Sequence, residues 1–367
     1  MKIGIDIRAA SGEKAGKGWY TFHLTYNLLK VDKRNQYILY TDTGVPGFGE
    51  FKNAEQKVIT GRGLLWHIHT SRDIKKENID VFFAPTSYIV PALLSKQIKT
   101  VITVHDLVAF LFKNTHNKKA VSIEKMFLKR ALKKAHFVCA VSENTKRDLV
   151  NKFKYDETKI GVVYAGADDN FKPVEKDSLA PFVEKTNLPR KFFLAVGTLE
   201  PRKNYPNLLK AFYEFIKIHK DYHLVIVGQK GWRYQEIYTL IDALRIKNRV
   251  HLLGYVSGTS LKNLYNLAEA LVFPSFYEGF GIPPLEAMKC GCPVIVSHKS
   301  SLTEVVGDAG IYIDPESPGS ITKAMGKIAF IPDLRENLIK QGFMQSKKFS
   351  WKLSAQKLLE ILRHARR

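Results

Sequence analysis

The stretch ALVFPSFYEGFGIPPLEAM, residues 270–288, contains the order of elements from which parallel α/β sheets are built. Its first four residues form a short apolar strand, and a Gly-rich loop follows. Pro283 and Pro284 suit the first turn of the next helix, where the missing N–H of proline costs no hydrogen bond. Glycine lets the backbone approach a ligand closely. The stretch therefore predicts a strand, a ligand-binding loop and a helix.

Two carboxylates lie eight positions apart in this stretch, Glu278 in the loop and Glu286 about one turn into the helix. Backbone N–H groups and a helix N-terminus at such a loop favour phosphate. Two acids close to a phosphate would repel it unless each accepts hydrogen bonds from hydroxyl groups. Sugar and ribose hydroxyls are suitable donors, so the pair points to a ligand with both sugar and phosphate.

The same alternation of β-branched runs and amphipathic stretches continues along nearly the whole chain. We expect one sheet from residues 2–7, 36–41, 81–84, 100–104 and 136–141, and a second from residues 192–197, 223–228, 250–253, 270–274, 293–297 and 310–313. Residues 166–190 hold three prolines and little periodicity, which indicates a domain boundary. The predicted fold class is α/β, with two facing Rossmann-like, doubly wound domains and a nucleotide cleft between them.

The boundary separates an N-terminal domain, residues 1–170, from a C-terminal domain, residues 171–348. A last amphipathic helix is expected over residues 349–367. Its apolar members are Trp351, Leu353, Leu358, Leu359 and Leu362.

Composition excludes several classes of protein. A chain of 367 residues with 45% hydrophobic and 25% charged residues is globular rather than disordered or fibrous. No apolar run approaches the roughly 18 residues that cross a bilayer, and the acid and second base within residues 1–8 do not fit a signal peptide. We therefore expect a cytoplasmic protein. The net charge of +22 indicates an anionic partner, and the three cysteines are expected to be small buried residues.

A second motif, GTLEPRKN at residues 197–204, directly follows an expected strand. Arg202 and Lys203 place two adjacent positive charges there. Arginine can bind a phosphate bidentately, whereas lysine acts as a point charge. These two residues are candidates for binding a diphosphate.

Two further motifs lie in the N-terminal half. Gly16 and Gly18 follow the first expected strand and open an amphipathic helix, but they do not form the dinucleotide fingerprint. His105 and Asp106 follow an apolar strand, and Asp106 is expected to brace its loop. Ser142 is expected to cap the helix that follows it.

Taken together, these motifs resemble those of GT-B-fold glycosyltransferases, and specifically those of family 4, whose members retain the anomeric configuration. The family signature of Glu, seven residues and Glu is present here as Glu278 to Glu286. The resemblance extends from residue 1 to about residue 362. It implies that the last helix returns to the N-terminal domain.

The resemblance also implies roles for the motif residues. Glu278 would contact hydroxyls of the donor sugar, and Glu286 would hold the ribose. The amides of Phe280, Gly281 and Ile282 would approach the donor sugar and phosphate.

Other roles implied by the family fall on the remaining motifs. Lys203 matches the diphosphate-binding lysine of the family, while Arg202 matches a Pro-Arg-Lys-Asn variant, because Thr198 stands where arginine is commoner. Gly16 and Gly18 would face the donor phosphates, and His105 would lie near the reacting carbon.

No metal or other cofactor is expected. The sequence contains no Asp-x-Asp motif, the diphosphate-metal motif of the other large glycosyltransferase fold. His67 and His69 have the two-residue spacing of a strand and lack a third ligand, so we interpret them as a chance pair.

The predicted function is transfer of a hexosyl unit, with mannose from GDP-mannose as the first choice, to a saccharide or lipid-linked acceptor in cell-surface polysaccharide or glycolipid synthesis. UDP-, ADP- and dTDP-sugars are alternative donors, and rhamnosyl, glucosyl and N-acetylglucosaminyl transfer are alternative reactions. A nucleotide-sugar epimerase and a nucleic-acid-binding protein are more remote. No nucleic-acid partner is expected, because Lys and Arg are spread over both domains.

A basic segment, residues 118–134, has two interpretations. Ile123, Phe127, Leu128, Ala131 and Leu132 recur at helical spacing among seven lysines and arginines. Such a helix could lie on an anionic membrane, which would place the protein at the inner membrane face. It could equally be a core-facing helix with a solvated basic face.

We also expect substitutions at Glu278, Glu286, Arg202 or Lys203 to leave thermal stability near wild type. The reason is that a loop acid and surface bases contribute little to stability.

Overall fold

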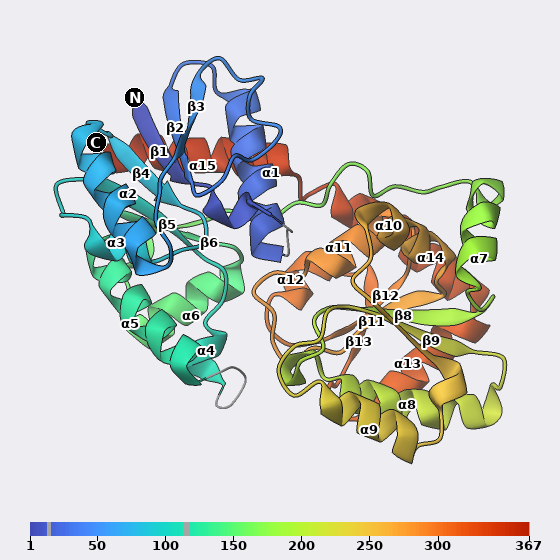
Figure 1. Ribbon diagram of the computed structural model, residues 1–367. Coiled ribbons are helices and arrows are strands. Elements are labelled where there is room, and N and C mark those ends of the chain that lie inside the picture. Colours follow the sequence, from blue (N-terminus) through green and yellow to red (C-terminus); the bar gives the residue numbers. More distant parts are fainter. Residues whose placement is uncertain (13–15, 113–117, 367) are drawn as a thin grey trace. The chain divides into compact units, whose positions relative to one another are not determined.

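The computed structural model describes residues 1–12, 16–112 and 118–366. The chain divides into two compact units. Unit 1 comprises residues 1–166 and 349–367, and unit 2 comprises residues 167–348. Each unit contains one parallel sheet surrounded by helices (Figure 1). Unit 1 ends its first segment at Gly166, whereas the sequence analysis placed the domain boundary at residue 170.

The sheet of unit 1 has the strand order β3-β2-β1-β4-β5-β6-β7, and all neighbouring strands are parallel. Its strands are β1 (Lys2–Asp6), β2 (Gln36–Thr41), β3 (Ala54–Val58), β4 (Val81–Ala84), β5 (Lys99–Val104), β6 (Phe137–Ala140) and β7 (Ile160–Val162). The direction of winding reverses between β1 and β4. Parallel α/β sheets bind ligands at the carboxyl ends of the strands beside such a reversal.

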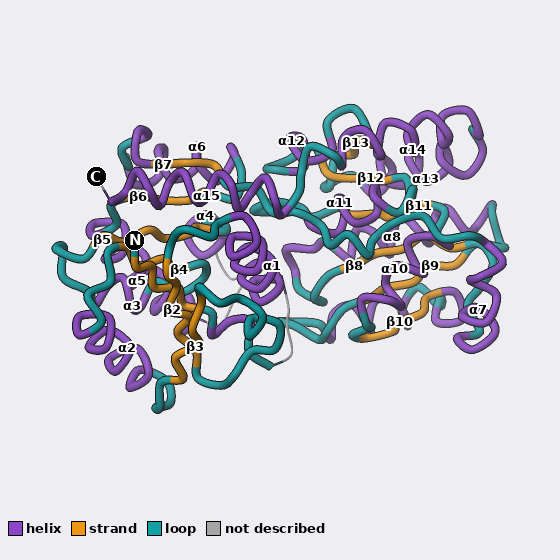
Figure 2. The backbone as a smooth tube through the Cα atoms, turned by 90° about the horizontal axis from the view of Figure 1, so that it is seen from above, coloured by secondary structure: helices purple, strands orange, loops and turns teal. Residues whose placement is uncertain are grey.

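Helices cover both faces of this sheet (Figure 2). They are α1 (Gly16–Val31), α2 (Leu64–Lys76), α3 (Ile89–Leu93), α4 (Val108–Leu111), α5 (Lys118–Lys134), α6 (Glu143–Phe153) and α15 (Trp351–Arg366). Trp66 of α2, Val90 of α3 and Leu128 of α5 share one buried core with the sheet. The C-terminal helix α15 packs along α1 and contacts β4, β5 and β6.

The sheet of unit 2 has the order β10-β9-β8-β11-β12-β13 and is also parallel. Its strands are β8 (Phe192–Val196), β9 (His223–Val227), β10 (Val250–Gly254), β11 (Ala270–Phe273), β12 (Val294–Ser297) and β13 (Gly310–Ile313). The winding reverses between β8 and β11, which are neighbours in the sheet. The helices are α7 (Ala180–Thr186), α8 (Tyr205–Ile218), α9 (Gln235–Ala243), α10 (Gly258–Leu267), α11 (Ile282–Lys289), α12 (Leu302–Val306), α13 (Pro318–Phe330) and α14 (Pro332–Ser346).

Every strand expected from the sequence is present, with its ends within one residue of the expected positions. The sequence analysis missed β3 and β7, which both lie at edges of the first sheet. Strand β3 reads AEQKV and buries none of its residues fully. An edge strand needs no continuous apolar run, because only part of its surface meets the core.

Two expectations about local structure were wrong. His67 and His69 lie on helix α2 rather than on a strand, because Trp66, Thr70 and Ile74 form a buried stripe at helical spacing. His67 is buried whereas His69 is exposed, so the two rings do not share a site. Leu353 is 51% exposed, unlike the other apolar residues proposed for the last helix.

The three cysteines are buried and free. Over the described residues, no helix is both long enough and apolar enough to cross a membrane.

Leu358 and Leu353 offer a matched test of how α15 stabilises unit 1. Leu358 is fully buried, whereas Leu353 on the same helix is half exposed. Leu358→Ala should lower the free energy of unfolding by about 2–5 kcal/mol, because it leaves a cavity in the core. Leu353→Ala should change it by no more than about 0.5 kcal/mol. Urea unfolding of both variants measures the difference, and equal effects would show that α15 does not pack on the unit as described.

Candidate active site

The polar residues singled out in unit 2 lie at the carboxyl ends of β8 and β11. Arg202 and Lys203 follow β8 in the 3₁₀ turn η4 (Pro201–Lys203), and Glu278 lies in the loop between β11 and α11. These strands are the neighbours at which the winding of the sheet reverses. The fold therefore brings together two motifs that are 75 residues apart in the sequence.

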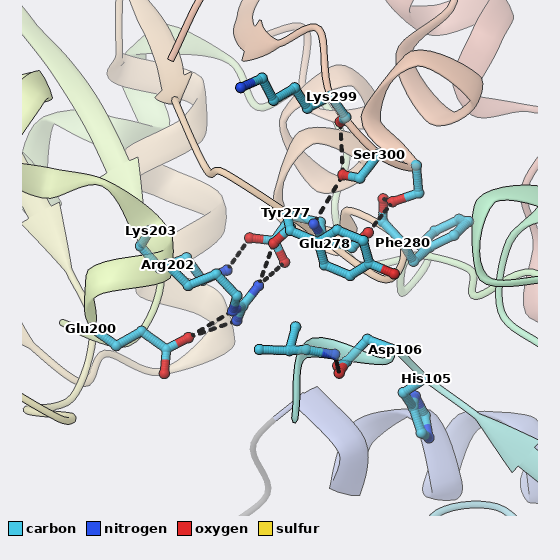
Figure 3. A network of polar contacts seen from close by, with 12 residues as sticks. His105, Asp106, Glu200, Arg202, Lys203, Tyr277, Glu278, Phe280, Lys299 and Ser300 are labelled. Carbon is cyan, nitrogen blue, oxygen red and sulfur yellow. Dashed lines mark hydrogen bonds and ion pairs between the residues drawn. The ribbon is translucent and has the colours of Figure 1, made fainter. Parts of the chain in front are cut away.

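Glu278 binds both cations at once (Figure 3). Its Oε2 is 2.7 Å from Nη1 of Arg202, and its Oε1 is 2.7 Å from Nζ of Lys203. Arg202 also contacts Oε1 of Glu200 through Nη2 at 2.7 Å. The side chains of Arg202, Lys203 and Glu278 are only 15%, 11% and 10% exposed. The cluster therefore holds two positive and two negative charges in a largely dry environment.

Hydrogen bonds fix the loop that carries the two cations. Asn204 has a left-handed backbone with φ of 61°, and its Nδ2 donates to the carbonyls of Pro274 and Pro315 at 3.0 and 2.6 Å. The N–H of Phe276 donates to the carbonyl of Arg202 at 2.9 Å. The β8 loop is thus tied to the β11 loop by backbone as well as by side chains.

The loop that carries Glu278 has its own supports. The N–H of Glu278 donates to Oγ of Ser300 at 2.9 Å, and Oγ of Ser301 lies 2.8 Å from the carbonyl of Glu278. Gly281 has φ of +128°, and a Cβ there would lie 2.9 Å from a side-chain carbon of Leu302. Glycine is therefore required at this position, and Ile282 then begins α11.

The two glutamates of the motif have opposite environments. Burial alone would raise the pKa of Glu278, but Arg202 and Lys203 outweigh burial and lower it to about 2. Around Glu286, burial prevails and raises the pKa of its carboxyl well above the usual range. Oη of Tyr265 donates to Oε2 of Glu286 at 3.0 Å, and Glu286 as a residue is half-buried. The carboxyl of Glu278 is therefore ionised at neutral pH, whereas the carboxyl of Glu286 takes up a proton at a higher pH than an ordinary glutamate does.

In unit 1, His105 lies just after β5, beside the first turns of α1. Its Nε2 is 2.8 Å from the carbonyl of Pro85, and its ring meets Tyr20 of α1 edge-on with the centroids 4.6 Å apart. Burial and the nearby charge of Lys17 lower the pKa of His105 to about 4. The ring is therefore neutral at pH 7, with Nε2–H as the donor to Pro85 and Nδ1 as an acceptor.

The glycines and caps of unit 1 can also be placed. Gly16 is the first residue of α1 and Gly18 the third, and Gly18 is buried. Oδ1 of Asp106 accepts from the N–H of Val108 at 3.0 Å, as expected of a residue that braces its loop. The N–H of Thr145 donates to Oγ of Ser142 at 3.0 Å, which confirms Ser142 as the cap of α6.

Sequence reasoning missed several residues that support the cluster. Glu200 could have been found from the sequence, because it is the acidic residue in the motif that contains Arg202 and Lys203. Ser300, Ser301 and Tyr265 could not, since they reach the site only through the fold. No group of three or more metal-ligating side chains occurs in the described ranges.

The expectation of unchanged stability rested on exposed side chains, and that premise was wrong. Glu278→Ala leaves Lys203 buried without its carboxylate, whereas Arg202 keeps Glu200. The substitution should lower the free energy of unfolding by about 3–5 kcal/mol, as breaking a buried ion pair does. Pyrophosphate should restore part of the melting temperature. Glu214→Ala is the control, because Glu214 pairs with Lys217 on the surface, and equal shifts for both variants would contradict this account.

Comparison with protein families gives two matches. The model described as Glycosyl transferases group 1 matches residues 178–345, and the model described as Glycosyltransferase Family 4 matches residues 53–171. An O-antigen chain mannosyltransferase B of Escherichia coli is 32% identical over 273 residues, which are 74% of this chain and 71% of that protein. The O-antigen chain mannosyltransferase RfbU of Salmonella typhimurium is 31% identical and covers 74% and 72% of the two chains.

Solved structures agree on the fold. The Anabaena protein Alr3699/HepE, solved with UDP-glucose, has a TM-score of 0.80 at 19% identity and covers 99% of this chain and 100% of its own. A sucrose-phosphate synthase from Thermosynechococcus elongatus also has a TM-score of 0.80, at 18% identity, and covers 99% and 98% of the two chains. These matches confirm the predicted GT-B class of fold. The chain therefore belongs to the glycosyltransferases of family 4 and is a glycosyltransferase.

Proposed function

We propose that this glycosyltransferase moves a mannosyl unit from GDP-mannose to a hydroxyl of a saccharide or lipid-linked acceptor, in the synthesis of a cell-surface polysaccharide or glycolipid. The likeness to two O-antigen mannosyltransferases supports mannose as the sugar. The main support for a donor site in unit 2 is the cluster of Arg202, Lys203 and Glu278. It offers cations for a diphosphate beside a carboxylate for sugar hydroxyls.

The donor would bind by exchange of partners within this cluster. The diphosphate competes with Glu278 for Lys203 and Arg202, since both anions need the same donors. Oxygens of Glu278 released in this exchange accept hydrogen bonds from the sugar. Glu286 accepts from the ribose, and the amides of Phe280, Gly281 and Ile282 approach the sugar and phosphate. His105 and the glycines Gly16 and Gly18 contribute from unit 1.

The proposed reaction retains the anomeric configuration. The bond from the anomeric carbon to the phosphate oxygen breaks, and the acceptor oxygen bonds to that carbon on the same face. The leaving phosphate oxygen takes the proton of the acceptor hydroxyl. The protein contributes orientation and charge stabilisation. We propose that Arg202 and Lys203 compensate the charge of the leaving diphosphate and that no metal or other cofactor takes part.

Other donors remain alternatives, because the motifs bind diphosphate and ribose rather than a particular base. A UDP-sugar, an ADP-sugar or a dTDP-sugar would satisfy the same contacts. An epimerase would convert the donor without an acceptor. Product masses from incubations with and without a saccharide acceptor distinguish these outcomes.

Substitutions should separate the roles of the two glutamates. Glu278→Gln should lower turnover by about 100-fold or more while leaving the affinity for GDP no weaker, because its partners are sugar hydroxyls. Lys203→Gln should weaken GDP binding by about 10- to 100-fold, as loss of a charged hydrogen bond does. Glu286→Gln should weaken GDP binding as well. Calorimetry with GDP and steady-state kinetics with GDP-mannose measure both quantities.

The control for these variants is Glu214→Gln, an exposed position on α8. All measurements belong at a temperature at which each variant is folded. The role of Glu278 is wrong if Glu278→Gln loses GDP binding as completely as Lys203→Gln does. Full turnover by either glutamate variant would also contradict the assignment.

We further propose that α5 places the protein on the cytoplasmic face of an anionic membrane. The structure separates the two faces of this helix: Leu128, Ala131 and Leu132 are buried in the core, which the core-facing interpretation requires. The exposed face holds Ile123, 43% exposed, and Met126, 48% exposed. It also holds Lys129, Arg130 and Lys133. Apolar and basic groups on one exposed face suit an anionic lipid surface.

Four of the seven bases named from the sequence are not counted as lipid-facing. Lys125 is half-buried, with its Nζ 5.5 Å from the centroid of the Phe110 ring. Nζ of Lys134 donates to the carbonyls of Ala92 and Leu94 at 2.7 and 2.8 Å, so this lysine serves the fold. The side chains of Lys118 and Lys119 lie outside the described residues. The lipid-facing bases in this proposal are therefore Lys129, Arg130 and Lys133.

Replacing Lys129, Arg130 and Lys133 together by glutamine should weaken binding to anionic vesicles by roughly 100-fold, at about 1 kcal/mol for each base. The matched control replaces the exposed lysines Lys220, Lys323 and Lys327 of unit 2 by glutamine. It has the same net charge and should bind nearly as wild type. Sedimentation with anionic and neutral vesicles at low salt measures both variants. Equal sedimentation of the wild type with the two kinds of vesicle would contradict the proposal.

A further inference from the structure

A second cluster of polar side chains lies in unit 1, where β1 ends. Arg8 begins the 3₁₀ turn η1 (Arg8–Ala10), directly beyond the carboxyl end of β1. Strand β1 is one of the two strands at which the winding of this sheet reverses. Ligands bind at this position in open parallel sheets. None of the roles proposed above uses Arg8 or its neighbours.

The guanidinium of Arg8 is held in a fixed position. Its Cζ lies 4.5 Å from the centroid of the Trp66 ring, and its Nη2 is 3.2 Å from Nε2 of His67. Trp66 is fully buried and His67 is 2% exposed, so neither neighbour can move away easily. Arg8 itself is half-buried and can still meet solutes. A fixed guanidinium loses little conformational entropy when it binds an anion.

Arg8 forms no ion pair with a carboxylate among the described residues. Two carboxylates belong to the same region but have other partners. Oδ1 of Asp6 accepts from the backbone N–H of Arg8 at 3.1 Å, and Oδ1 of Asp42 lies 3.0 Å from Oγ of Ser11. Burial raises the pKa of Asp6 to about 6, and Arg8 offsets part of that rise. Asp6 therefore acts on Arg8 from beyond ion-pair distance.

His67 does not balance the positive charge of Arg8. Burial and the charge of Arg8 lower the pKa of His67 to about 4, so its ring is neutral. Nε2 then accepts from Arg8, and Nδ1 carries the ring proton. That Nδ1 is buried and has no hydrogen-bond partner in the part of the chain that the structure describes. The first turn of α2, to which Trp66 and His67 belong, contains no acidic residue and no side-chain cap.

These observations describe a fixed cation that has no carboxylate at ion-pair distance among the described residues. We propose that Arg8, together with the first turn of α2, forms a binding site for a phosphate or diphosphate ester. Trp66 covers one face of the guanidinium, and the remaining N–H groups can bind phosphate oxygens. Leu64 and Leu65, which precede Trp66, are 54% and 58% exposed. They offer an apolar surface for the group that the phosphate carries.

The anion site does not depend on the proposed donor chemistry. We assign the phosphate ester to the acceptor, and this assignment rests on the proposed function, because the acceptor would be the second phosphate-bearing ligand of the reaction. The probes are therefore inorganic phosphate and hexyl phosphate, and GDP is kept saturating so that the donor site is occupied. Binding to the full chain is measured by calorimetry. Hexyl phosphate should bind more tightly than inorganic phosphate if Leu64 and Leu65 contribute.

Arg8→Gln should weaken phosphate-ester binding by about 10-fold or more, which corresponds to loss of a charged hydrogen bond. Arg8→Lys should be intermediate, because lysine keeps the charge but not the planar fork. Arg34→Gln is the control: Arg34 is exposed and precedes β2, so it lies at the opposite end of the parallel pair β1 and β2. It should retain phosphate affinity within about twofold, since it removes the same charge far from the site.

Thermal unfolding gives a second readout. With GDP saturating, phosphate should raise the melting temperature of the wild type, and Arg8→Gln should abolish that rise without lowering the melting temperature measured with GDP alone. Equal weakening by Arg8→Gln and Arg34→Gln would overturn the proposal, because net charge alone would then explain the binding. Absence of phosphate-ester binding by the wild type would overturn it too. If Arg8→Gln does not fold, the affinity of Arg8→Lys for the phosphate ester serves as the test. Wild-type affinity in Arg8→Lys would contradict a site in which the planar guanidinium binds the phosphate.

GDP affinity is recorded for every variant in the same experiment. Arg8→Gln should leave it unchanged within about twofold. Loss of GDP binding in the wild type, with phosphate-ester binding intact, would refute the donor proposal alone.

Discussion

The carboxylate of Glu278, shared between Arg202 and Lys203, is the interaction on which the arrangement of the unit 2 loops depends. Moving a charged group out of water costs several kcal/mol, so none of these three side chains could be buried without the others. Their mutual attraction holds the β8 loop against the β11 loop, and Asn204 reinforces it through two buried backbone carbonyls. A preformed pair of cations at a sheet edge follows directly, and a diphosphate is the ligand that such a pair suits.

The same motif holds two glutamates in contrasting states. Two cations lower the pKa of Glu278 to about 2, whereas burial raises the pKa of Glu286 despite the hydrogen bond from Tyr265. A carboxylate that stays ionised suits hydrogen bonds from sugar hydroxyls while neighbouring cations bind phosphate. A carboxyl whose pKa is raised by burial can bind neutral hydroxyls without repelling the diphosphate. Environment thus shifts the pKa values of two chemically identical side chains, eight residues apart, in opposite directions.

Much of the fold was predictable because buried parallel strands read as short apolar runs, as β8 and β11 do. Edge strand β3 was not, because the three central residues of AEQKV are polar and none of the five is fully buried. The motif residues Glu278, Arg202 and Lys203 could be named from their spacing, but their burial could not, and the expectation of unchanged stability assumed exposed side chains. Ser300, Ser301 and Tyr265 carry no local signal, since only tertiary packing brings them to the site. His67 was misplaced because a two-residue alternation within a helix imitates a strand.

A crystal structure of the chain with GDP-mannose bound tests the central claim most directly. The account predicts that diphosphate oxygens lie within hydrogen-bond distance of Arg202 and Lys203, and that mannose hydroxyls contact the carboxylate of Glu278. The ribose should contact Glu286. A diphosphate bound away from both cations, with Glu278 still paired with Arg202 and Lys203, would contradict it.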